Sequence, residues 1–160
     1  MKLLIGFGNE MRGDEGLGPR LVREVARWNN PGLEVVYPRQ LTPELAERMS
    51  AADAVLFIDA VRRQPDICMR RVQPGTERYD PHALDPVGLL ALTSALYGAR
   101  PPAWLLTIPG DRFSFSRELS EVGKGRLEEA VPWVRTWLLA DEDGQEEAPA
   151  LAEMELGAGD

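Results

Sequence analysis

The chain has 160 residues, of which 18 are Lys or Arg and 26 are Asp or Glu, so its formal net charge is -8 at neutral pH. This length is typical of one domain with a substantial core, and the acidic excess argues against a broad nucleic-acid-binding or anionic-membrane surface. The single cysteine, Cys68, excludes an internal disulfide, no uncharged apolar run is long enough to span a bilayer, and we expect a cytoplasmic protein.

Strand-like and helix-like segments alternate along the chain. Residues 2–7 form a short apolar run that predicts a buried strand, and residues 18–28 carry apolar side chains at helical spacing. Residues 42–50 predict a helix with Thr42 as its cap and Pro43 at its first position. Further strands are predicted at 33–38, 54–60, 66–73 and 103–110, and further helices at 87–97 and 118–139.

The alternation favours a three-layer α/β sandwich. Residues 54–60 are almost wholly apolar, which predicts a central strand, whereas residues 66–73 have mixed faces and predict an edge strand. Residues 1–140 are expected to form the single domain. Residues 141–160 are rich in acids, Ala and Gly with few core-forming side chains, and they predict a disordered acidic tail.

The loop after the first strand combines glycines with acids in the segment "LLIGFGNEMRGDEGLG", residues 3–18. Its acidic residues are Glu10, Asp14 and Glu15. Gly6 and Gly8 begin like a dinucleotide-binding fingerprint, but Met11 stands where the third glycine is needed. Because carboxylates at this turn would repel a pyrophosphate, the loop suits a cation better than a phosphate.

Candidate functional residues follow the predicted strands, where the ligands of open α/β sheets bind. They are Asn9, Asp14, Glu15, Asp59 and His82. Taken singly, Asp14 or Glu15 could favour the positive end of the first helix, Asp59 could cap its strand, and His82 could be a surface residue. Together, Glu15, Asp59 and His82 would face one crevice and supply two carboxylates and an imidazole to a first-row divalent metal.

These residues lie in motifs that resemble those of the [NiFe]-hydrogenase maturation endopeptidases. The resemblance covers residues 3–139 and is carried by "IGFGNEMRGDEGLG", "LFIDAV", "DPHALDPVGLLALTSALYG" and "LLTIPGDRFSFSRELSEVGKGRLEEAV". It implies a five-stranded twisted sheet with one antiparallel strand, for which residues 66–73 are the natural candidate. It also implies that Glu15, Asp59 and His82 bind metal.

The implied activity is removal of a short C-terminal peptide from the precursor of the hydrogenase large subunit after nickel insertion. Nickel is then carried by the substrate, and the enzyme needs no resident metal. The glycines would let the backbone turn tightly near this partner, while the loop acids face a cation. Water is the expected nucleophile, with Glu15 and Asp59 as catalytic carboxylates and Asp14 as an assisting group. The precursor is the expected partner, with no nucleic acid or membrane.

The segment "PRQLTPEL", residues 38–45, departs from the Asp-Gly-Gly-Thr sequence of many family members. It is expected to face the substrate, and it resembles the branch that serves cytoplasmic, NAD-linked bidirectional hydrogenases.

Other classes of protein stay open from the sequence. A nucleotide-binding oxidoreductase would use Gly6 and Gly8, with Arg39 as a hint of a 2′-phosphate site. A zinc hydrolase or a nonenzymatic nickel-binding chaperone would use the same three ligands as the protease. Cys68 lies in a predicted strand and is expected to be a small apolar residue instead of a nucleophile.

Overall fold

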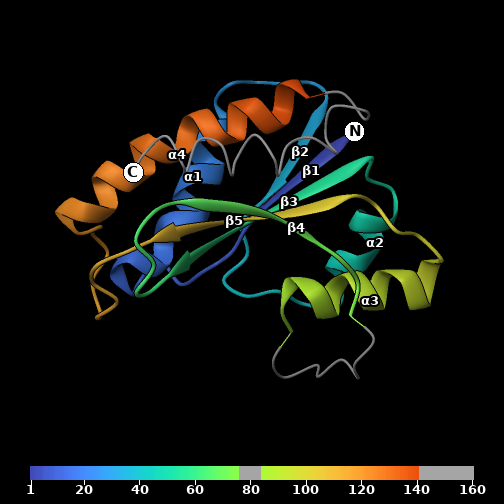
Figure 1. The fold of residues 1–160 in the computed structure, drawn as a ribbon, viewed down its shortest axis with the longest axis horizontal. Helices are drawn as coiled ribbons and strands as arrows, with labels where there is room; N and C mark the ends of the chain where they lie inside the picture. The colour runs from blue at the N-terminus through green and yellow to red at the C-terminus, as the bar shows by residue number, and fades with distance from the viewer. Residues whose placement is uncertain (76–83, 141–160) are drawn as a thin grey trace.

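The computed structural model describes residues 1–75 and 84–140, which form a sheet of five strands between two layers of helices (Figure 1). The strands are β1 (Lys2–Gly6), β2 (Leu33–Val36), β3 (Ala54–Val61), β4 (Cys68–Val72) and β5 (Ala103–Pro109). The helices are the short 3₁₀ helix η1 (Gly13–Gly16), α1 (Leu17–Ala26), α2 (Leu45–Ser50), α3 (Pro86–Tyr97) and α4 (Glu121–Leu139). The predicted three-layer α/β/α sandwich is confirmed.

The strands lie in the order β2-β1-β3-β5-β4. β1 runs parallel to β2 and β3, β3 runs parallel to β5, and β4 runs antiparallel to β5 at the edge. The predictions of a central β3 and of an antiparallel edge strand within residues 66–73 are therefore confirmed.

Each face of the sheet has its own apolar core. Helices α1 and α4 cover one face and α2 and α3 cover the other (Figure 1). Leu56 and Ile58 of β3 pack on the first face, whereas Val55 and Phe57 pack on the second. Successive side chains of a strand point to opposite faces, so a strand covered on both sides needs an unbroken apolar run.

The sequence placed two helix starts too early. Residues 42–45 form a tight turn in which the Leu45 N–H donates to the Thr42 carbonyl at 3.1 Å, and α2 begins at Leu45 without a side-chain cap. The cap assigned to Thr42 is therefore wrong, because that residue belongs to the preceding turn. Helix α4 begins at Glu121, where the Ser120 hydroxyl accepts a hydrogen bond from the Gly123 N–H at 2.9 Å.

Two parts of the sequence interpretation lie outside the described residues, namely His82 and the proposed tail at 141–160. Within residues 1–75 and 84–140, no helix is long and apolar enough to cross a membrane.

The glycines that suggested a phosphate cradle serve close packing between β1 and α1. A Cβ added to Gly6 would lie 2.3 Å from the Gly18 carbonyl oxygen and 2.4 Å from a methyl group of Val22. A Cβ added to Gly18 would lie 2.8 Å from the Ile58 carbonyl oxygen. Both glycines therefore let the helix approach the sheet at the edge where the loop begins.

We predict that Gly6→Ala lowers the free energy of unfolding by about 2 kcal/mol or more, because the added methyl group overpacks this contact. Gly125→Ala in α4 is the matched control, since its Cβ would meet no atom within 4 Å. That control should stabilise the protein by about 0.5 to 1 kcal/mol through helix propensity. Urea denaturation followed by circular dichroism measures both changes, and equal effects would contradict the packing role of Gly6.

Candidate functional site

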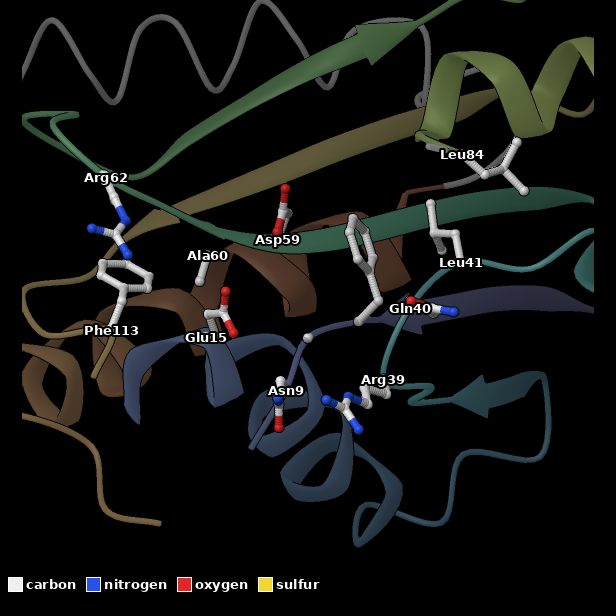
Figure 2. Close-up of a pocket in the computed structure, with 12 residues that line it drawn as sticks. Asn9, Glu15, Arg39, Gln40, Leu41, Asp59, Ala60, Arg62, Leu84 and Phe113 are labelled. Atoms are coloured by element: carbon white, nitrogen blue, oxygen red, sulfur yellow. The ribbon is translucent and has the colours of Figure 1, made fainter. Parts of the chain in front are cut away.

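A pocket of about 370 Å³ opens at the carboxyl ends of β1 and β3 (Figure 2). It is lined by Phe7, Gly8, Asn9, Glu15, Arg39, Gln40, Leu41, Asp59, Ala60, Arg62, Leu84 and Phe113. The chain passes from β1 to its outer neighbour β2 and then returns to β3 on the other side. The pocket thus lies at the switch point of the sheet, where open α/β folds bind ligands.

Glu15 and Asp59 bring two carboxylates to this pocket from different elements. Glu15 belongs to η1, and Asp59 lies near the carboxyl end of β3. Both side chains line the same cavity (Figure 2). The Arg12 Nε lies 3.4 Å from the Glu15 carboxylate. The structure therefore brings these two candidate residues, Glu15 and Asp59, into one pocket.

The pKa of Asp59 is raised to about 6: burial is the main cause, the negative charge of Glu15 adds to it, and a hydrogen bond from the Ala60 N–H opposes it. A carboxyl group that is desolvated beside a like charge favours its neutral form. Raised carboxyl pKa values of this kind are enriched at functional sites.

The third predicted ligand, His82, lies outside the described residues. Leu84, two positions later in the chain, lines the pocket. Within residues 1–75 and 84–140, no group of three or more His, Cys, Asp and Glu side chains is arranged to hold a metal ion. Glu15 and Asp59 are thus the carboxylates that the described residues bring to this pocket.

Asp14 occupies a different environment from its neighbour Glu15. Its side chain is completely buried and is not among the residues that line the pocket. The carboxylate accepts hydrogen bonds from the Asp111 N–H at 2.7 Å, the Arg112 N–H at 3.0 Å, the Ser120 N–H at 2.9 Å and the Ser120 hydroxyl at 2.6 Å. This position favours a structural role for Asp14.

Burial opposes ionisation of Asp14, but the hydrogen bonds from Ser120, Asp111 and Arg112 outweigh it and lower the pKa of this carboxyl. Space for the charged group comes from two glycines. A Cβ on Gly123 would lie 2.3 Å from the Asp14 Oδ1, and a Cβ on Gly110 would lie 2.6 Å from the Asp14 Cβ.

Backbone hydrogen bonds join the loop that carries Asp14 to the loop after β5. The Gly13 N–H donates to the Ser116 carbonyl and the Asp14 N–H to the Arg112 carbonyl, each at 2.8 Å. The Ser116 N–H donates to the Met11 carbonyl at 2.9 Å. One loop continues into Glu15 and the other contains Phe113, so these backbone hydrogen bonds fix two walls of the pocket.

Of the three acids in the first loop, only Glu15 lines the pocket. Both carboxylate oxygens of Glu10 pair with the guanidinium of Arg23, and Asp14 is buried against α4. The expectation that the loop acids together face a cation is therefore wrong for Glu10 and Asp14. The spacing of the acids within this loop did not reveal that Glu10 pairs with a residue of α1, or that Asp14 accepts hydrogen bonds from the loop before α4.

Gly8 allows the close approach that places Glu15. Its φ angle is 149°, and an added Cβ would lie 2.0 Å from the Glu15 carbonyl oxygen. A larger residue here would displace η1 from the end of β1.

Arg39 and Gln40 line the pocket, as expected for the segment proposed to face the substrate. The sequence analysis missed Arg62 and Phe113, although both follow the carboxyl ends of strands, β3 and β5. Applying the strand-end rule to β5 as well as to β1 and β3 would have found Phe113. Cys68 begins β4, is partly buried, and is not among the residues of the pocket.

We predict opposite stability changes for Asp14→Asn and Asp59→Asn. The low pKa of Asp14 contributes stability above its unfolded-state pKa, near 4, which is lost as the pH falls through its folded-state value. Asp14→Asn turns an NH₂ group toward several donors and should cost about 2 to 4 kcal/mol at pH 7.

The raised pKa of Asp59 has the opposite effect on the free energy of unfolding. Its cost to stability is absent below about pH 4, grows as the pH rises toward about 6, and is constant above that value. Asp59→Asn should therefore stabilise the metal-free protein by up to about 3 kcal/mol at pH 7.5 and by little at pH 4. Urea denaturation in the presence of a chelator at both pH values measures these changes, and two substitutions with the same sign at pH 7.5 would contradict this assignment.

No protein-family model and no curated protein matches the sequence. Among solved structures, the hydrogenase maturating endopeptidase HybD from E. coli is 22% identical, with 86% of this chain and 91% of that chain covered and a TM-score of 0.67. HybD from Thermococcus kodakarensis, a [NiFe] hydrogenase maturation protease, is 21% identical over 84% of this chain and 97% of that chain, with a TM-score of 0.63. A hydrogenase 2 maturation peptidase from the Thaumarchaeota archaeon SCGC_AB-539-E09 is 21% identical over 86% and 97%, with a TM-score of 0.64. The resemblance carried by the sequence motifs is thus confirmed at the level of architecture: this chain has the fold of the [NiFe] hydrogenase maturation endopeptidases.

Proposed function

We propose that this protein is an endopeptidase that removes a C-terminal peptide from the nickel-loaded precursor of a [NiFe]-hydrogenase large subunit. The observation that carries the proposal is the pair of carboxylates, Glu15 and Asp59, in an open pocket at the switch point of the sheet. The three solved structures described above share this fold and are named as hydrogenase maturation endopeptidases, proteases or peptidases.

Nickel is part of the substrate in this proposal. Glu15 and Asp59 offer oxygen ligands to it, and His82 is the proposed nitrogen ligand. Leu84 lines the pocket, and two residues of chain span at most about 7 Å, so the connection to Leu84 supports the assignment of His82. Imidazole and carboxylate ligands suit a first-row divalent ion.

Water is the proposed nucleophile. The residues that line the described pocket include no Ser, Thr or Cys, so they offer no hydroxyl or thiol nucleophile. Glu15 and Asp59 are the groups proposed to orient a water molecule and to accept its proton. Asp14 contributes indirectly in this scheme, because its hydrogen bonds fix the loops that hold Glu15 and Phe113.

The same lining bears on the alternative functions. Two observations disfavour a nucleotide-binding oxidoreductase. The space beside Gly6 is occupied by α1, and the carboxylates of Glu15 and Asp59 would repel a pyrophosphate. A nickel-binding chaperone would use the same ligands without peptide cleavage. The presence of Arg39 and Gln40 in the pocket supports the view that this segment contacts the precursor. The likeness of residues 38–45 to the branch that serves cytoplasmic, NAD-linked hydrogenases makes such a hydrogenase the proposed source of that precursor.

We predict that the purified protein shortens the nickel-loaded precursor at its C-terminus and leaves the apo precursor intact. Glu15→Gln, Asp59→Asn and His82→Ala should each lower the cleavage rate by about 100-fold or more, because each removes a group that acts on the metal or on water. Mass spectrometry of the precursor's C-terminus gives the readout.

Glu10→Gln is the matched control, since Glu10 lies in the same loop but pairs with Arg23 outside the pocket. It should cleave at the rate of the unchanged protein. Transfer of nickel to the apo precursor without loss of mass would instead establish the chaperone, and equal cleavage of both precursor forms would contradict recognition through nickel.

We further predict that the free protein binds one Ni²⁺ or Cd²⁺ ion weakly at this pocket. Glu15→Gln, Asp59→Asn and His82→Ala should each weaken binding, whereas Glu10→Gln should not, because only the former remove a proposed ligand. Isothermal titration calorimetry measures the affinities, and circular dichroism verifies that each variant is folded. Identical affinities in all variants would contradict the ligand set.

A further inference from the structure

Arg62 stands at the edge of the pocket, on the chain that leaves β3. Its side chain lines the cavity, and its guanidinium carbon lies 4.5 Å from the centroid of the Phe113 ring (Figure 2). Phe113 is only 8% exposed, so the ring is a buried platform under an exposed cation. Cation–π stacking of this kind holds the plane of the guanidinium while its N–H groups remain available.

Arg62 also differs from Arg12 and Arg23, which pair with acids of the first loop. Arg12 pairs with Glu15 and Arg23 pairs with Glu10. Over residues 1–75 and 84–140, the guanidinium of Arg62 makes no hydrogen bond or ion pair. It stacks on the Phe113 ring. A planar fork of N–H donors without an acceptor matches a carboxylate in bidentate geometry.

The platform for Arg62 is itself held in place. Phe113 follows Arg112, whose N–H donates to the Asp14 carboxylate at 3.0 Å and whose carbonyl accepts from the Asp14 N–H at 2.8 Å. An anchored ring reduces the ordering cost when a ligand binds the cation above it.

We propose that Arg62 binds a carboxylate of the peptide that is removed, and that this contact determines which precursor is accepted. The inference rests on the proposed function and adds a specificity residue to it. Arg62 follows Asp59 by three residues, a span of about 10 Å in extended chain, so the substrate carboxylate lies about three extended residues from the nickel site.

The charges of the pocket make this contact selective. Glu15 and Asp59 repel a free anion that approaches Arg62. A carboxylate of the nickel-loaded precursor enters the pocket together with the nickel ion, and the positive charge of that ion offsets the repulsion. Arg62 therefore favours a carboxylate that belongs to the loaded precursor. The carboxylate comes either from an acidic side chain of the C-terminal extension or from its free C-terminus.

The test measures KM and kcat for cleavage of the nickel-loaded precursor by the unchanged protein and by Arg62→Ala, Arg62→Lys and Arg63→Ala. Arg63 is the matched control, because it is the next residue and is exposed but does not line the pocket. Arg62→Ala should raise KM about tenfold or more and leave kcat within about twofold, as expected for a charge-assisted hydrogen bond to bound substrate. Arg62→Lys should be intermediate, and Arg63→Ala should match the unchanged protein.

Two altered precursors identify the source of the carboxylate. One has every Asp and Glu of the extension changed to Asn and Gln, and the other carries added Gly-Ser residues that move the free C-terminus away. The precursor that lacks the bound carboxylate should show a raised KM with the unchanged protein and no further rise with Arg62→Ala. Normal cleavage with the same KM for Arg62→Ala and the unchanged protein would overturn the role of Arg62, as would equal effects of Arg62→Ala and Arg63→Ala. Absence of cleavage by the unchanged protein would instead overturn the proposed function.

Discussion

The buried carboxylate of Asp14 is the interaction on which the pocket depends. A desolvated charge destabilises a protein unless donors surround it, and here three backbone N–H groups and the Ser120 hydroxyl do so. Those donors come from the loop after β5 and from the start of α4. This side chain, together with the backbone hydrogen bonds between the two loops, joins the first loop, which carries Glu15, to the loop that carries Phe113. Loss of the Asp14 carboxylate would weaken the support of both walls.

Asp14 and Asp59 show how one residue type serves two purposes in the same region. Hydrogen bonds to Asp14 stabilise its charged form, whereas burial near Glu15 disfavours the charged form of Asp59. The carboxylate oxygens of Asp14 accept hydrogen bonds from the protein itself. The carboxylate of Asp59 lines the pocket, where a cation that binds would neutralise it. The fold thus stabilises the charge that supports the loops and leaves a less stable charge in the pocket.

The pocket combines cations and anions instead of carrying one sign of charge. Glu15 and Asp59 lie between Arg62 on one side and Arg39 on the other (Figure 2). Such a lining suits a ligand that itself carries both signs, as a metal-bearing peptide does. A purely acidic pocket would attract free divalent ions with little regard to the chain that carries them. In the proposed function, the arginines are the groups that contact the polypeptide.

The sequence by itself determined the layers, the central position of β3 and the edge position of β4, because apolar periodicity reports directly how many faces of an element are covered. It also brought Glu15 and Asp59 to one edge of the sheet, since the carboxyl ends of parallel strands meet there. Only the tertiary structure separated the three loop acids into an exposed pair with Arg23, a buried anchor and a pocket residue. Their partners come from segments up to 106 positions away in the chain, and spacing within one loop carries no information about such contacts. For the same reason, the contact between Arg62 and Phe113 follows only from the tertiary structure, which sets β3 and β5 side by side.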